Sequence, residues 1–195
     1  MDTKTRVLSV ASVSFAQRGY EAVSLDALAS ELGLTKQTIL YHFGSKPALL
    51  DTVVAEAAAE LARTLEEAVG RSGEVWARID AVVRAVFALA VRRPELIGLL
   101  REVSRLGPPA TTAVLDALQP LVDRAVDALD QAMDRGELRR ADARLVLVSA
   151  YATVTGVVTD TAVLRAVGLD LDLRRAVSLR RTLLQFLHAA LVPDP

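Results

Sequence analysis

The stretch "LDALASELGLTKQTILYHFGSK", residues 25–46, has the pattern of two short helices separated by a tight turn. Ser24 and Thr35 precede the two helices, and side chains of this kind accept a hydrogen bond from a free N–H at a helix start. Gly33 lies where the first helix should end, because glycine readily adopts the left-handed conformation of a helix terminus. This spacing is typical of a helix-turn-helix unit.

The second of these helices is unusually polar for this chain. Two of the three lysines lie in the stretch, with one of the three tyrosines and one of the two histidines. A short helix with so many polar outer positions cannot bury every face, because unpaired polar groups are costly to remove from water. We therefore expect it to face water or a binding partner. Its outward positions are Lys36, Gln37, Tyr41 and His42.

The sequence around this unit predicts helices throughout. Val7, Ala11 and Phe15 mark one face of a first helix, which Gly19 is placed to end. Beyond Pro47 the apolar residues follow longer helical periods, and Pro120 should kink or divide one of them. We expect these helices over 47–69, 74–91, 94–106, 110–135, 142–167 and 171–192. The sequence thus predicts an all-α fold of about nine helices, with a three-helix domain at 1–46 and a larger helical domain at 47–195.

The composition limits the classes of function. Hydrophobic residues make up 52% of the 195 residues, and without cysteine there is no disulfide, thiolate metal site or cysteine nucleophile. The net charge of −1 gives no overall attraction to a polyanion. The N-terminus lacks the apolar run of a signal peptide, and the longest uncharged segment, 145–159, is too short for a membrane span. We expect a soluble cytoplasmic protein that does not bind a membrane and has no metal or cofactor.

The residues of the opening motif extend into a longer match. Residues 15–50, "FAQRGYEAVSLDALASELGLTKQTILYHFGSKPALL", resemble the DNA-binding domain of the tetracycline-repressor (TetR/AcrR) family of transcription regulators. The shared elements are F-x-x-x-G-Y, the serine before the second helix, L-x-x-x-L-G, the H-F pair and G-S-K-x-x-L. The resemblance implies a sequence-specific DNA-binding regulator and no enzyme. It further implies a ligand-responsive repressor that binds a palindromic operator as a homodimer.

The DNA contacts follow from the helix-turn-helix geometry and from the resemblance. The first residues of the second helix of such a unit reach base edges in the major groove. Lysine donates to guanine acceptors there, and glutamine pairs with adenine. Residues further along, and those at helix starts, are placed for phosphates. The candidate DNA-binding residues are Ser24, Thr35, Lys36, Gln37, Thr38, Tyr41, His42 and Lys46.

One position departs from the family pattern. Most members carry a tyrosine where this chain has Leu40, and here the aromatic residue is shifted to Tyr41. The phosphate contact that the family makes from that position therefore has no direct counterpart in this chain.

A dimer is expected on electrostatic grounds as well. The first fifty residues carry five cationic side chains against four acidic ones, and DNA affinity grows with the number of phosphates neutralised. One such domain would bind DNA weakly, so two copies are needed. Aliphatic stripes on the last two predicted helices fit a four-helix interface, although they could instead be buried within their own domain. The candidate interface residues are Val154, Val158, Leu183, Leu184, Leu187 and Leu191.

The resemblance also implies a small-molecule effector in the larger domain. The aliphatic composition favours an apolar effector with few polar anchors. Large or hydroxylated side chains are scarce in this domain, so those present are candidates for the pocket, and each could equally be a core residue. They are Trp76, Phe87, Met133, Tyr151 and Thr155.

Two other classes of function compete with a regulator. An enzyme would need a catalytic constellation, and the chain has two isolated histidines and no glycine-rich phosphate loop or H-x-x-x-H metal spacing. A helical adaptor could use the same aliphatic stripes to bind proteins. Binding to specific DNA separates a regulator from both.

Overall fold

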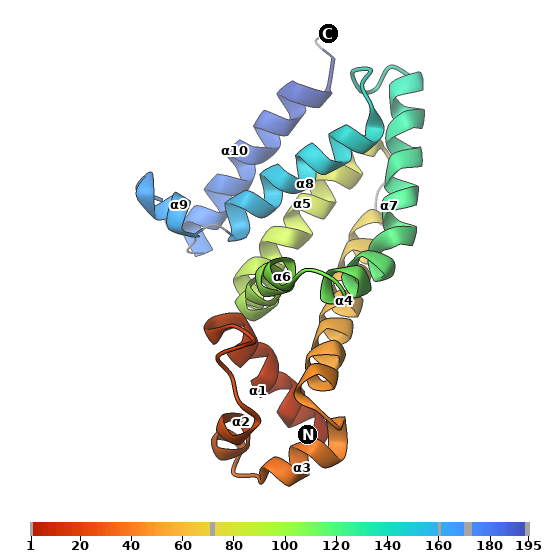
Figure 1. The fold of residues 1–195 in the computed structure, drawn as a ribbon. Helices are drawn as coiled ribbons and strands as arrows, with labels where there is room; N and C mark the ends of the chain where they lie inside the picture. Colours follow the sequence, from red (N-terminus) through yellow and green to blue (C-terminus); the bar gives the residue numbers. More distant parts are fainter. Residues whose placement is uncertain (1, 71–72, 160, 170–172, 194–195) are drawn as a thin grey trace. The chain divides into compact units, whose positions relative to one another are not determined.

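The computed structural model describes residues 2–70, 73–159, 161–169 and 173–193 (Figure 1). Within these ranges the chain forms helices and no strand, which confirms the all-α prediction. No helix in the described ranges is long and apolar enough to cross a membrane. The helices are α1 (Thr3–Arg18), α2 (Leu25–Leu32), α3 (Lys36–Phe43), α4 (Lys46–Gly70), α5 (Val75–Arg92), α6 (Pro94–Leu106), α7 (Ala110–Asp134), α8 (Ala143–Thr159), α9 (Thr161–Ala166) and α10 (Leu173–Leu191).

Two predictions about the long helices have different outcomes. The segment expected as one helix over 142–167 is described as α8 and α9 on either side of residue 160, which lies outside the described residues, so its continuity stays a prediction. The alternative that Pro120 divides α7 is wrong, because Pro120 lies inside a single helix. Proline removes one N–H and so leaves the carbonyl of Asp116 without its helical partner. Both residues are exposed, so water can bond that carbonyl and the helix continues.

The chain packs as two compact units. Unit 1 comprises 1–61 and 93–117, and unit 2 comprises 62–92 and 118–195. The three N-terminal helices therefore share a unit with the start of α4, with α6 and with the start of α7. The boundary expected at 46/47 rests on the motif alone and stays a prediction.

Unit 1 is held together by a close approach of α1 and α6. Phe15 and Leu99, one from each helix, are fully buried. Gly98 lies against Ala16: a Cβ atom added to Gly98 would come within 3.0 Å of the Ala16 Cβ and 3.2 Å of its carbonyl oxygen. The two backbones approach this closely because residue 98 has no side chain.

Substitution of Gly98 by valine is expected to destabilise unit 1. Forcing a branched side chain against the backbone of Ala16 overpacks the core, which costs about 1–3 kcal/mol. The midpoint of chemical denaturation, followed by circular dichroism, measures the change. Gly156→Val in α8 is the control, because nothing lies within 4 Å of a Cβ atom added there. If Gly98→Val unfolds at the same midpoint as Gly156→Val, the close packing of α1 on α6 is wrong.

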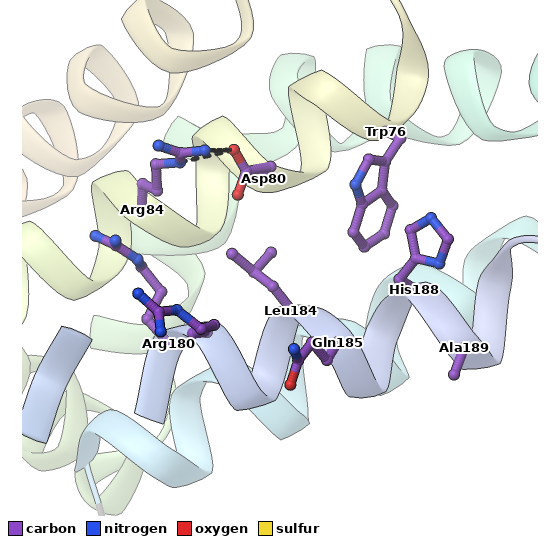
Figure 2. Close-up of a pocket in the computed structure, with 9 residues that line it drawn as sticks. Trp76, Asp80, Arg84, Arg180, Leu184, Gln185, His188 and Ala189 are labelled. Carbon is purple, nitrogen blue, oxygen red and sulfur yellow. Dashed lines mark hydrogen bonds and ion pairs between the residues drawn. The ribbon is translucent and has the colours of Figure 1, made fainter. Parts of the chain in front are cut away.

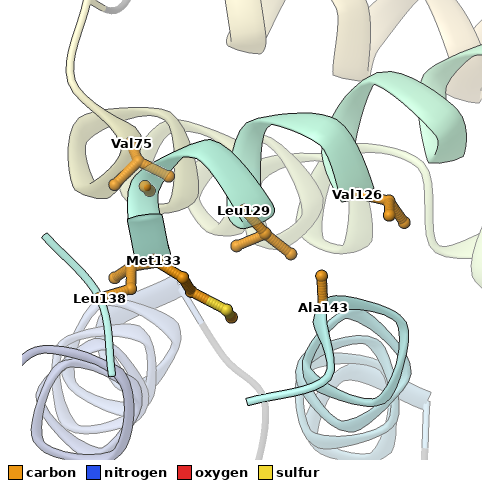
Figure 3. Packing of buried hydrophobic residues seen from close by; sticks show 7 residues of the cluster. Val75, Val126, Leu129, Met133, Leu138 and Ala143 are labelled. Atoms are coloured by element: carbon orange, nitrogen blue, oxygen red, sulfur yellow. The ribbon is translucent and has the colours of Figure 1, made fainter. Parts of the chain in front are cut away.

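Unit 2 has an aliphatic core in which α5, α7 and α8 meet (Figure 3). Val75 begins α5, Leu129 and Met133 come from α7, and Ala143 begins α8. Leu138, in the connection between α7 and α8, is only 2% exposed. The end of α10 is tied to this connection, because the backbone N–H of Arg139 donates to the carbonyl of Leu191 at 2.7 Å.

Candidate nucleic-acid interface

The turn between α2 and α3 is fixed by its own side chains. Ser24 Oγ accepts the N–H of Ala27 at 3.0 Å, and Thr35 Oγ1 accepts the N–H of Thr38 at 3.1 Å. Gly33 has the left-handed backbone angles φ 66° and ψ 32°, which end α2. The caps and the glycine terminus predicted from the sequence are confirmed.

α3 has one buried face and one exposed face. Ile39 and Phe43 are buried in unit 1 and anchor the helix. Gln37 is exposed, and Tyr41 is 85% exposed although it is a large aromatic residue. Leu40, where the family pattern has tyrosine, is half-buried. The shift of the aromatic residue by one position thus turns it away from the core and into solvent.

Lys36 forms an ion pair across the turn. Its Nζ lies 2.9 Å from Asp26 Oδ2, and both side chains are more than half exposed. Exposed pairs of this kind contribute little stability, so the ammonium group can exchange Asp26 for another anion at small cost. The neighbouring hydroxyls of Thr35 and Thr38 are 2.9 Å apart and share a hydrogen bond.

Lys46, at the start of α4, is held beside the end of α1. Its Nζ lies 4.2 Å from the centre of the Tyr20 ring and 3.5 Å from the carbonyl oxygen of Glu21. Burial, together with the negative charges of Glu21 and Asp51, raises the pKa of the Tyr20 hydroxyl, which therefore stays neutral. The cation–π contact orients the ammonium group without neutralising its charge.

His42 lies between two aromatic rings. Its ring centroid is 5.3 Å from that of Tyr41, in an edge-on arrangement, and 6.2 Å from that of Phe43. The residue is half-buried. The eight predicted DNA-binding residues all lie within α3, its cap, or the starts of α2 and α4.

A residue that the sequence did not indicate supports this region from α6. Glu102 is 8% exposed, and its Oε1 accepts the backbone N–H of Tyr20 at 2.6 Å. Arg105 donates to both carboxylate oxygens at 2.8 Å. The bonds from Arg105 lower the pKa of Glu102, burial opposes them, and the bond from Tyr20 adds to them. Eighty-two positions separate Tyr20 from Glu102, so no local pattern could have signalled the contact.

The five candidates for an effector pocket are not brought together. Trp76 lines a groove between α5 and α10, with its ring 4.7 Å from that of His188. Phe87 and Met133 are buried, and Met133 belongs to the core of unit 2. Tyr151 is 64% exposed, and Thr155 Oγ1 donates to its carbonyl oxygen at 2.7 Å.

The residues predicted for the dimer interface differ in how deeply they are buried. Val154, Val158, Leu183 and Leu187 are less than 8% exposed within unit 2, so they pack inside the subunit. Leu184 and Leu191 are half-buried. α8 and α10 instead expose a different apolar set, with a groove of about 350 Å³ between these helices. The exposed residues are Leu145 (66%), Val148 (61%), Tyr151 (64%), Val177 (46%) and Phe186 (61%).

Comparison with known proteins agrees with the motif. Residues 7–53 match the family described as "Bacterial regulatory proteins, tetR family". The chain is 26% identical over 156 residues to the HTH-type transcriptional activator FasR of Mycolicibacterium smegmatis. The aligned region covers 76% of this chain and 69% of FasR.

Two solved structures share the fold. A protein from Saccharomonospora viridis, described as a transcriptional regulator and crystallised with choline, superposes with a TM-score of 0.81 at 21% identity over 98% of both chains. AibR, in complex with isovaleryl coenzyme A and operator DNA, gives a TM-score of 0.69 at 23% identity over 80% of this chain and 86% of AibR. Together with the capped turn and the exposed α3, the match identifies residues 7–53 as a helix-turn-helix domain of the kind found in bacterial regulatory proteins of the tetR family.

Proposed function

We propose that the protein is a cytoplasmic, ligand-responsive repressor that binds a palindromic operator as a homodimer. The observation that carries the proposal is the polar, exposed face of α3 on a helix-turn-helix unit whose turn is locked by two caps and a glycine. A rigid unit of this kind presents the start of its second helix to the major groove.

Base contacts are assigned to the first turn of α3. Lys36 donates to guanine O6 or N7 after leaving Asp26, and Gln37 pairs with adenine N6 and N7. Thr38 contacts a thymine methyl group or a phosphate. The first turn of the second helix in a helix-turn-helix unit faces base edges, and the chemistry of these three side chains differs enough to read sequence.

Phosphate contacts are assigned to the surrounding residues. Lys46 offers a cation at the start of α4, where the helix dipole also favours an anion. Tyr41, which is 85% exposed near the end of α3, supplies the hydroxyl that Leu40 lacks. His42 and the cap residues Ser24 and Thr35 flank the same surface, which tracks the DNA backbone.

The dimer interface is assigned to the outer face of α8 and α10. Val148 and Phe186 are representative, since each is 61% exposed although large and apolar. Leu145 and Phe186 line the same groove between α8 and α10, and exposed apolar surface of this kind marks an interaction site. A second copy is the fitting occupant, because a palindromic operator requires two recognition helices about 34–36 Å apart, or a multiple of that.

Val148→Asp with Phe186→Asp is expected to give monomers. Two carboxylates at the centre of an apolar interface would have to be desolvated without partners, which opposes association strongly. Sedimentation velocity measures the state, and Leu115→Asp with Val167→Asp is the control, since these residues are also apolar and exposed. Dimers that persist in the first variant would contradict the assignment. Leu183→Asp with Leu187→Asp should instead unfold the chain, because both residues are buried.

The effector is proposed to act through α4. This helix starts at Lys46 and runs to Gly70, so it contributes to both units. A ligand that favours one position of α4 would change the spacing of the two recognition helices and so the operator affinity. Choline and isovaleryl coenzyme A, bound by two proteins of the same fold, show that the fold accommodates small organic ligands of different chemistry.

Selection of genomic fragments that bind the purified protein, followed by a gel shift and a transcription assay, tests the proposal. A regulator retards a palindromic fragment and releases it as salt rises, because binding displaces counterions. A repressor lowers the transcript made from that fragment. A helical adaptor or an enzyme would select no fragment, and a transcript that rises would contradict repression.

A further inference from the structure

A groove of about 500 Å³ runs between α5 and α10 within unit 2. Figure 2 shows Arg84 and Arg180 at one end, Trp76 and His188 at the other, and Leu184 between them. The two ends therefore differ in chemistry. One is cationic and the other is aromatic.

The basic end has more positive than negative charge. Arg84 is paired with Asp80 on the same helix, and that ion pair raises the pKa of Arg84. Arg180 and Arg181 form no ion pair with any residue that the structure describes. α10 contains no acidic residue from Leu173 to Leu191 that could neutralise them. Arginine does not lose its proton in a protein, so this end of the groove stays cationic and attracts an anion.

The remaining part of the groove suits an apolar body. Leu184 is half-buried, and the edge-on contact of Trp76 with His188 closes the far end. Seven residues of helix separate Arg181 from His188, a rise of about 11 Å. A carbon chain of about ten atoms or a fused aromatic ring system spans such a distance.

We infer that this groove binds an amphipathic organic anion, with its carboxylate or phosphate held by Arg180 and Arg181 and its apolar body along Leu184 to Trp76. Arginine suits this role because its planar fork donates two parallel hydrogen bonds to a carboxylate or phosphate. The groove lies within unit 2 and ligand binding is measured without DNA. Failure to bind the anion would therefore contradict this inference without contradicting the proposed repressor function. An amphipathic anion differs from the apolar effector expected from the composition, and that expectation stays a prediction.

The single tryptophan of the chain makes the test direct. Trp76 lines the groove, so its fluorescence reports ligands that reach the aromatic end. Decanoate and decyl phosphate are titrated below their micellar concentrations, with 1-decanol as the neutral probe of the same length. Saturable changes in emission are expected with at least one anion, at an apparent Kd at least about tenfold lower than for the alcohol. The comparison of the two anions distinguishes a carboxylate site from a phosphate site.

The variant R180A/R181A is expected to weaken anion binding at least about tenfold while leaving weak decanol binding unchanged. R140A/R144A is the matched control, since it removes the same charge from exposed positions of unit 2 outside the groove. Both variants are checked for native helicity, and R180K/R181K serves as a charge-preserving second variant. Equal affinity for decanoate, decyl phosphate and decanol, or equal loss in the control variant, would overturn the inference. A gel shift with decanoate then shows separately whether the groove regulates DNA binding.

Discussion

Substitution of both Lys36 and Gln37 by alanine is expected to lower operator affinity about 100-fold or more, because each bidentate base contact supplies about 1–3 kcal/mol of discrimination. Both subunits of a dimer lose these contacts, so the losses of binding free energy at the two half-sites add. Fluorescence anisotropy with a labelled operator measures the change.

The specificity of this effect distinguishes base reading from general electrostatics. The variant Gln17→Ala with Arg101→Ala is the control, since it removes one amide and one cation from exposed positions of unit 1 outside α3. The affinity of the α3 variant for unrelated DNA should fall only by the small amount that results from losing one cation per subunit. If the α3 variant and the control lose operator affinity equally, the base contacts are not made by Lys36 and Gln37.

The sequence predicted the local features of the interface well because their determinants are adjacent in the chain. Ser24 and Thr35 cap N–H groups three residues away, and Gly33 ends α2 through its own backbone angles. Such short-range interactions depend only on residues that are close together in the sequence. The same holds for the exposed face of α3, since helical period alone separates Ile39 from Gln37 and Tyr41.

The sequence predicted the partners of the long helices less well. An aliphatic stripe shows that a helix has a buried face, but it does not say whether the covering surface is the same subunit or another. Leu183 and Leu187 therefore appeared as interface residues, although they pack within unit 2. Phe186, between them in sequence, lies on the exposed face. The basic groove was missed for a related reason, since Arg84 and Arg180 come together only when α5 packs on α10.

Glu102 shows how a distant contact supports the site. Its carboxylate binds the N–H of Tyr20 just after α1, and the Tyr20 ring carries the ammonium group of Lys46. Both bonds lie within unit 1. We therefore assign Glu102 as a positioning residue that acts through Tyr20 on Lys46, for which a phosphate contact is proposed.

Glu102→Ala is expected to destabilise unit 1 by about 2–4 kcal/mol, because the partly buried N–H of Tyr20 loses a charged acceptor. Arg105 contributes less to this loss, since its side chain is 57% exposed and water can replace the carboxylate. Glu102→Gln keeps the shape and one acceptor oxygen, so it should lose roughly 1 kcal/mol. Chemical denaturation near pH 7 measures both, with Glu95→Gln at the start of α6 as the control.

The pH dependence separates the charge of Glu102 from its shape. The folded state lowers the pKa of this carboxyl, so its ionised form contributes stability that is present above the unfolded value of about 4.3. That contribution is lost as the pH falls through the lower, folded pKa. The difference in unfolding free energy between the wild type and Glu102→Gln should therefore be constant from pH 6 to 7 and shrink below about pH 4.3. If this difference in unfolding free energy does not change with pH, the protonated Glu102 makes the same hydrogen bonds as the ionised one. The charge of Glu102 would then contribute nothing to its bond with the N–H of Tyr20.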